Sequence, residues 1–225
     1  MNTEQRSNII AKFTEIINSD RVVVLKGTLQ QRTRYLTVVL DDIYLPQNAS
    51  AIMRTSECLG IQSLHSIQER NKHKINRDVV KGAAKWTELD CYSDSTGRKA
   101  CIENLKQQDY KIVAMTLSED CIPLEELPVD KKLALCFGCE ETGLSKELED
   151  KADYKAQIPM HGFTQSYNVS VSAGICLYYL INKIKDTGQD WQLNKKEKEI
   201  LLIDWLSKST PTGSSLLEKY KEESE

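Results

Sequence analysis

The sequence lacks a long apolar run. No stretch approaches the ~18–20 apolar residues that a membrane-spanning helix requires, and the opening residues MNTEQRSNII lack the profile of a secretory signal. We therefore expect a cytoplasmic protein with no membrane segment. The seven cysteines are odd in number and irregularly spaced, which favours reduced thiols over a disulfide framework.

The sequence also lacks the motifs of several ligand classes. It has neither a Gly-x-Gly-x-x-Gly fingerprint nor a Gly-Lys-Ser/Thr phosphate loop, which argues against a dinucleotide crossover and a P-loop. The three histidines show no metal-ligand spacing, and the lone Cys136-Phe-Gly-Cys139 favours a buried structural pair over a redox or zinc site. We expect no metal site.

A general excess of basic residues is missing as well. Thirty lysines and arginines stand against 33 acidic residues, a net charge of −3, which weighs against a generally basic nucleic-acid binder. Basic residues are nevertheless in local surplus at residues 1–34 and 66–85, and carboxylates concentrate at 116–155. The second surplus comes from Arg70, Lys72, Lys74, Arg77, Lys81 and Lys85. Both solvated surfaces of a neutral enzyme and a phosphate-binding surface fit this pattern.

What is present is an alternation of short β-branched runs and helical patterns, in a composition typical of globular proteins: 40% apolar and 28% charged residues. The expected strands are 21–25, 35–40, 61–67, 111–115, 132–137 and 154–158. The expected helices are one ending near Asn18 and those near 48–59, 76–82, 98–108, 145–152, 169–184, 200–206 and 216–220. This alternation predicts an α/β fold, with a parallel sheet covered by helices on both faces.

Three segments place polar residues at strand ends, where a parallel sheet has its ligand crevice. The first runs from Leu40 to Arg54, with Asn48, Ala51 and Arg54 spaced by three on a helix that begins just after Pro46. Taken alone, it also fits a capping asparagine and a surface arginine.

The other two segments follow later strands. In Leu133-Ala-Leu-Cys-Phe-Gly-Cys-Glu-Glu-Thr-Gly-Leu-Ser, two glycines allow a close backbone approach and Glu140 lies at the turn. In Ile158-Pro-Met-His-Gly-Phe-Thr-Gln-Ser-Tyr-Asn, a loop rich in backbone donors leads into an apolar helix. Each alone also fits an ordinary turn with a serine cap, Ser145 in the first case.

Together, in this order and spacing, the segments resemble the three motifs of the SpoU/TrmH branch of the SPOUT methyltransferases, over about residues 35–181. The resemblance implies a SPOUT fold with a C-terminal trefoil knot, an obligate homodimer and 2′-O-methylation of an RNA ribose with S-adenosyl-L-methionine as cofactor. It places five residues at the reacting centre: Asn48, Arg54, Glu140, Ser166 and Asn168. It places the cofactor along Met115, Thr116, Gly138, Ile158, Met160 and Tyr167.

The flanking segments indicate which member of the branch the chain resembles. Residues 1–34 are too few for a separate RNA-binding domain, so we expect an N-terminal helical extension (1–34), a methyltransferase domain (35–186) and a C-terminal helical extension (187–225). This layout is similar to enzymes that methylate guanosine 18 in the transfer-RNA D-loop. Ribosomal RNA as the substrate, and an RNA-binding protein without catalysis, are the alternatives.

The role of Arg54 has two interpretations. In the family, removal of the ribose proton is attributed to the motif-one arginine, but a free guanidinium has a pKa above ~12 and is a poor base. Alternatively, Arg54 stays charged and stabilises the developing alkoxide and a neighbouring phosphate.

Overall fold

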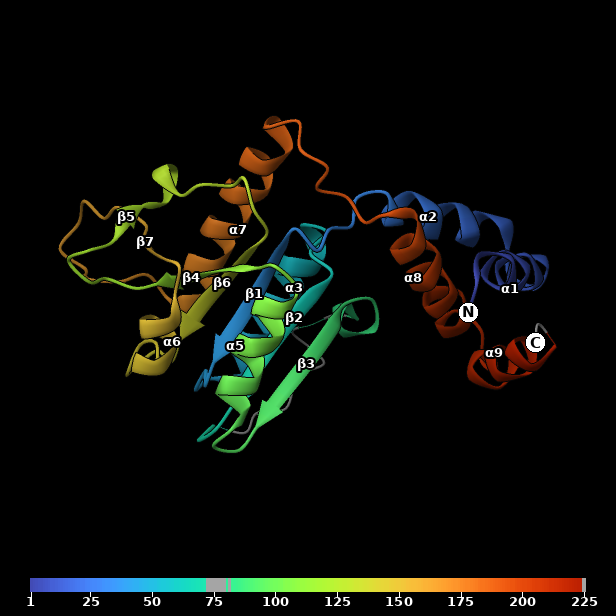
Figure 1. The fold of residues 1–225 in the computed structure, drawn as a ribbon, viewed down its shortest axis with the longest axis horizontal. Helices are drawn as coiled ribbons and strands as arrows, with labels where there is room; N and C mark the ends of the chain where they lie inside the picture. Colours follow the sequence, from blue (N-terminus) through green and yellow to red (C-terminus); the bar gives the residue numbers. More distant parts are fainter. Residues whose placement is uncertain (72–79, 81, 224–225) are drawn as a thin grey trace. The chain divides into compact units, whose positions relative to one another are not determined.

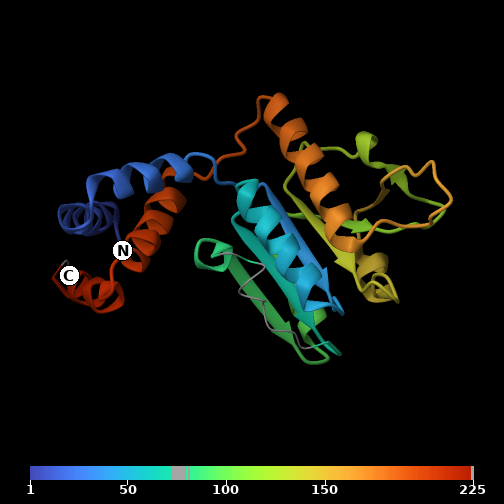
Figure 2. The same ribbon diagram turned by 180° about the vertical axis from the view of Figure 1, so that it is seen from behind.

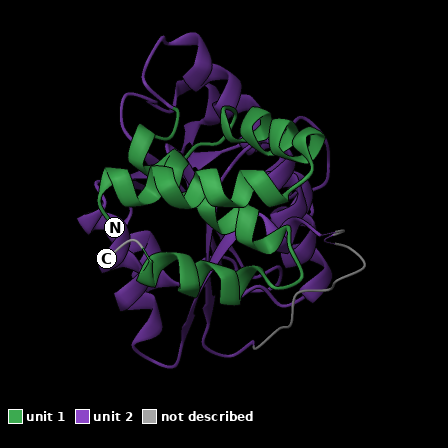
Figure 3. Cartoon of the chain, turned by 90° about the vertical axis from the view of Figure 1, so that its right-hand side faces the viewer, with its two compact units in different colours: residues 1–33, 192–225 green, residues 34–191 purple. Residues whose placement is uncertain are grey.

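The computed structural model describes residues 1–71, 80 and 82–223, and they form two compact units (Figures 1 and 3). One unit is continuous, residues 34–191, and the other combines residues 1–33 with 192–225. In this part of the chain, no helix is both long and apolar enough to cross a membrane. All seven cysteines are free, and Cys136 and Cys139 are both buried.

The continuous unit is built on a parallel sheet. Its described strands lie in the order β3-β2-β1-β6-β4-β7-β5, and every neighbouring pair is parallel. The strands are β1 (Leu36–Asp41), β2 (Ser63–Gln68), β3 (Glu88–Ser93), β4 (Lys111–Met115), β5 (Ile122–Pro123), β6 (Leu133–Gly138) and β7 (Tyr154–Gln157). The predicted parallel α/β fold is confirmed.

Helices cover both faces of this sheet (Figures 1 and 2). They are α3 (Pro46–Cys58), α5 (Gly97–Gln107), α6 (Lys146–Lys151) and α7 (Val169–Asp186), with 3₁₀ turns η1 (Ala83–Lys85) and η2 (Leu124–Glu126). Successive side chains of β1 alternate between the faces: Leu36, Val38 and Leu40 belong to the core with α3 and α7, whereas Val39 belongs to the core with α5 and α6.

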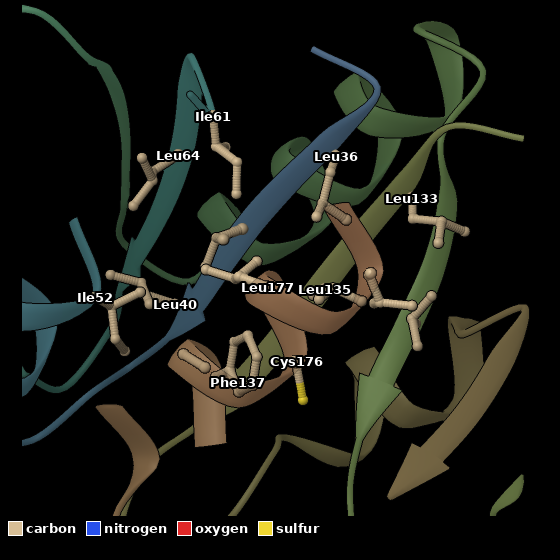
Figure 4. Packing of buried hydrophobic residues seen from close by; sticks show 14 of the residues in the cluster. Leu36, Leu40, Ile52, Ile61, Leu64, Leu133, Leu135, Phe137, Cys176 and Leu177 are labelled. Atoms are coloured by element: carbon tan, nitrogen blue, oxygen red, sulfur yellow. The ribbon is translucent and has the colours of Figure 1, made fainter. Parts of the chain in front are cut away.

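The core beneath α3 and α7 is the larger of these two. Leu135 of β6 and Leu177 of α7 have no exposed surface, and Figure 4 shows both in this cluster. Burying a side chain of this kind contributes roughly 1.5–3 kcal/mol. The sheet therefore gives a stable frame, and the loops at its edge are free to carry polar groups.

The second unit consists of helices from the two ends of the chain. They are α1 (Thr3–Ile16), α2 (Ser19–Leu29), α8 (Lys195–Lys208) and α9 (Gly213–Glu222). Phe13 of α1 meets Tyr220 of α9 edge to face at 5.2 Å between ring centroids. Arg6 and Glu199 form an ion pair at 2.6 Å, and Trp205 is buried.

One predicted strand is wrong. Residues 21–25 lie in helix α2, where Val22, Leu25 and Leu29 are buried while Val23 and Val24 are 68% and 55% exposed. The buried positions follow a helical period, which the short β-branched run concealed. The strands β3 and β5 were not predicted: β3 is a mostly exposed edge strand and β5 has two residues. The helix expected at 76–82 lies largely outside the described residues.

Candidate active site

A cavity of about 570 Å³ lies at the carboxyl ends of the strands. Its walls come from the segments that follow β4, β6 and β7, with the first turns of α3 and α7. This is the edge where open parallel sheets bind ligands, and the volume suits a ligand of cofactor size. Among the lining residues are Met115, Thr116, Gly138, Ile158, Met160 and Tyr167, all six of the residues that the sequence associated with the cofactor.

Glu140 connects the first two motifs at this cavity. Its carboxylate accepts hydrogen bonds from the Asn48 side-chain amide at 2.5 Å and from the backbone amides of Tyr44 and Leu45 at 3.0 and 3.4 Å. Partial burial alone raises the pKa of Glu140, but these hydrogen bonds outweigh it and hold the pKa below its usual value. The carboxylate is therefore ionised at neutral pH.

Asn168 adds the third motif. It caps α7 by accepting from the amide of Ser170 at 2.9 Å, and its own side-chain amide donates to Asn48 Oδ1 at 3.3 Å. Glu140, Asn48 and Asn168 thus form one hydrogen-bonded series, although 120 residues separate Asn48 from Asn168. Ser166 also lines the cavity, so four of the five residues expected at the reacting centre meet here.

Arg54 lies apart from them. It is exposed on α3 and does not line the cavity of its own chain. Asn48 and Arg54 are six residues apart, and at ~100° per residue their directions differ by about 120° around the helix. Residues three apart, such as Asn48 and Ala51, share a helix face, but residues six apart do not. Asn48 faces the cavity and Arg54 does not.

The second motif is shaped by a tight backbone approach. A Cβ on Gly138 would lie 2.2 Å from the backbone of Gly143 and Leu144, so only glycine fits at this strand end. Gly143 has a φ of 70°, a value that favours glycine. In contrast, Ser145 precedes α6 but makes no side-chain capping bond there.

The sequence did not reveal every group at the site. The amides of Tyr44 and Leu45 are backbone groups and carry no side-chain signature; Pro46, which opens α3, is the nearest signal. Of the basic residues at 66–85, Lys72, Lys74, Arg77 and Lys81 lie outside the described residues. Of the others, Arg70 binds Asp42 at 2.9 Å and Lys85 lies over the ring of Trp86.

A parallel sheet with a cavity at its carboxyl edge, lined by both polar and apolar residues, defines an α/β protein of the ligand-binding kind. The model of the SpoU rRNA Methylase family matches residues 35–178. The chain belongs to this family of methyltransferases.

Individual relatives and solved structures are consistent with this family. The chain is 41% identical over 201 residues to the tRNA (guanosine(18)-2′-O)-methyltransferase of Borreliella burgdorferi, covering 89% of each chain. It is similar to the crystal structure of the A. aeolicus TrmH/SpoU tRNA modifying enzyme, with a TM-score of 0.74, 32% identity, and coverage of 83% of this chain and 95% of that one. The SpoU methyltransferase AviRb from Streptomyces viridochromogenes, solved in complex with the cofactor AdoMet, shares the fold, with a TM-score of 0.59 and 21% identity over 70% of this chain and 60% of that one.

Proposed function

We propose that the protein methylates the ribose 2′ oxygen of guanosine 18 in the D-loop of transfer RNA, with S-adenosylmethionine as donor. The observation that carries this proposal is the series Glu140–Asn48–Asn168, which joins three distant motifs at one cavity. The relatives named above support tRNA as the substrate.

The cavity fits the cofactor. Met115, Gly138 and Ile158 line the cavity, and the apolar side chains of Met115 and Ile158 offer contacts for a flat, partly apolar ligand. The ionised Glu140 favours a positively charged ligand group nearby. S-adenosylmethionine supplies an already activated methyl group bound to a sulfonium.

This chain's residues then have to position the ribose and assist loss of its proton. Asn48 is held from both sides, by Glu140 and Asn168, so its side chain is fixed at the cavity wall. Ser166 offers a hydroxyl at the same wall. Such fixed polar groups orient a substrate without rearrangement during the reaction.

Arg54 needs either a movement of its side chain or a second copy of the chain to reach a reacting centre. The homodimer provides the second copy in our proposal. Support comes from α7, where Val171, Ile175 and Tyr178 follow a helical period and are 48%, 38% and 65% exposed. An apolar stripe of this kind is typical of a helix that packs against a partner. The cytoplasmic location, the trefoil knot and the division of the chain into segments 1–34, 35–186 and 187–225 stay predictions.

The decisive experiment is methylation of a tRNA transcript, followed by nuclease digestion and mass spectrometry. We expect 2′-O-methylguanosine at position 18 and no product when that nucleotide carries a 2′-deoxyribose. A methylated base would refute the ribose assignment, and methylation of ribosomal RNA alone would favour the ribosomal alternative. RNA binding without any product would favour a non-catalytic protein.

A further inference from the structure

Two consecutive carboxylates are buried at the carboxyl end of β1, directly before the first motif. Asp41 and Asp42 are each 1% exposed, a rare situation for charged side chains unless they are paired. Neither lines the cavity.

The Asp41 carboxylate has two partners. Oδ2 accepts the backbone amide of Ser145 at 2.8 Å, and Oδ1 accepts Nε of Arg98 at 3.1 Å. Arg98, on α5, also donates from Nη1 to Glu69 at 2.6 Å. The Arg98 guanidinium thus binds the carboxylates of both Asp41 and Glu69, which fixes the direction of the Asp41 side chain.

The hydrogen bond from the Ser145 amide to Asp41 lies at one end of the loop that carries Glu140. The backbone of Asp41 is paired in register with Gly138, the last residue of β6. Its carboxylate holds Ser145, where the chain enters α6. One residue of β1 therefore binds both ends of the excursion 139–144, and that excursion carries Glu140 and part of the cavity wall.

The Asp42 carboxylate similarly binds a second segment, the residues Arg70 and Asn71 that follow β2. Its φ of 58° lies in the left-handed region, which is rarely occupied by residues other than glycine. Its carboxylate accepts the backbone amides of Arg70 and Asn71 at 3.0 and 2.8 Å and Nε of Arg70 at 2.9 Å. These three hydrogen bonds stabilise the left-handed backbone of Asp42, which costs energy. The chain then continues to Tyr44 and Leu45, whose amides bind Glu140.

We propose that Asp41 is a positioning residue: by closing the excursion 139–144 at Ser145, it presents Glu140 to Asn48. Arg98 orients the Asp41 carboxylate for this task. The expected effect on turnover rests on the methyltransferase function proposed above, whereas the effect on the shape of the excursion does not.

Asp41→Asn is the direct test. The substitution preserves size, but its NH₂ group faces a donor, either the amide of Ser145 or Nε of Arg98, so one of the two bonds is lost. We expect amide hydrogen exchange of a peptide spanning 139–146 to become about ten-fold faster or more. Turnover on tRNA should fall about ten-fold, with the KM for tRNA near that of the wild type.

Asp153→Asn is the matched control. Asp153 also holds one backbone amide, that of Ile112 at 2.9 Å, and one cation, Lys111 at 2.8 Å, but it does so at the amino end of β4. The control should lower the unfolding midpoint without changing exchange at 139–146 or turnover. Equal loss of turnover in both variants would overturn the positioning role, because it would show a general effect of stability.

Arg98→Lys is a milder second variant, in case Asp41→Asn folds poorly. It leaves both carboxylates in place but removes the fork that joins them, so we expect an intermediate increase in exchange at 139–146. Unchanged exchange in this segment in both Asp41→Asn and Arg98→Lys would refute the proposal. A wild-type protein that fails to methylate tRNA would refute the proposed function instead, and the exchange measurement, which needs no substrate, would still decide the role of Asp41.

Discussion

The two units differ in where their polar groups lie. In the unit 34–191, buried strands end in polar loops, and side chains far apart in the sequence meet at one cavity. In the unit 1–33 and 192–225, four helices pack through apolar side chains. Most of its charged side chains lie on the surface, and the buried exceptions are Arg6, paired with Glu199, and Arg32. The family match, 35–178, falls entirely within the sheet unit. From this difference we expect damage to the sheet-edge cavity to affect turnover and damage to the helical unit to affect RNA affinity.

The strongest test of this division is Asn48→Ala. Asn48 is bound by both Glu140 and Asn168, so its loss breaks the series at its centre. We expect turnover to fall by about 10² to 10³, the usual scale for losing one fixed polar group at a reacting centre, with a near-normal unfolding midpoint. Asn104→Ala is the control: Asn104, on α5, donates a similar hydrogen bond to the Tyr92 hydroxyl of β3, and this variant should keep most activity. Similar losses in both variants would contradict the assignment.

Arg54→Ala follows, with turnover expected to fall on the order of 10². Because Arg54 is exposed on α3, the fold and the affinity for S-adenosylhomocysteine should hardly change. Arg54→Lys separates the two roles. If the planar fork matters, lysine is as poor as alanine at every pH; if proton removal matters, activity recovers toward pH ~10, near the free lysine pKa. Wild-type turnover in the alanine variant would mark Arg54 as a surface residue.

The helical unit is tested by its basic residues. Lys26, Lys195 and Lys198 surround an open groove of about 400 Å³ between α2 and α8. Changing these three to glutamate should weaken tRNA binding about ten-fold or more and reduce its salt dependence, because fewer phosphate counterions are released. Affinity for S-adenosylhomocysteine should stay unchanged.

Lys208, Lys219 and Lys221 provide the control for that groove, since they are three other lysines of the same unit. Their reversal should have a smaller effect; an equal loss would point to net charge rather than to the groove. The reversal of Lys72, Lys74 and Arg77, outside the described residues, is expected to weaken binding too, and unaltered affinity there would place the RNA surface elsewhere.

The two units also differ in how well the sequence predicted them. Strands β1, β4 and β6 have continuous apolar runs because both of their faces are buried, so their positions were predicted within a residue or two. Helix α2 was mistaken for a strand because three consecutive valines hid a buried stripe of only three residues. Motif order identified Asn48, Glu140 and Asn168, whereas the backbone amides that hold Glu140 and the carboxylate of Asp41 have no pattern at short range. Their roles arise only when β1 and β6 pair.

The smallest expected effect concerns pH. Each of the three histidines belongs to the sheet unit by sequence, and His65 is buried in β2 with Nδ1 3.3 Å from the Tyr92 hydroxyl and 3.5 Å from the Asp90 carboxylate. Burial lowers the pKa of His65, and the Asp90 carboxylate offsets this only in part. Below the ordinary histidine pKa of ~6.5, the unfolded chain therefore binds a proton that the folded chain does not. As the pH is lowered, the free energy of unfolding falls until the pH passes the lower folded pKa.

His65→Asn should flatten this slope in urea titrations between about pH 7.5 and 5.5, whatever its effect on the absolute stability. In a variant with Trp86 and Trp191 replaced by phenylalanine, the remaining Trp205 lies in the helical unit. Its fluorescence then reports that unit if the two unfold separately, and the transition it follows should lack the His65 slope. Parallel slopes for wild type and His65→Asn would show that other groups set the pH dependence of the sheet unit.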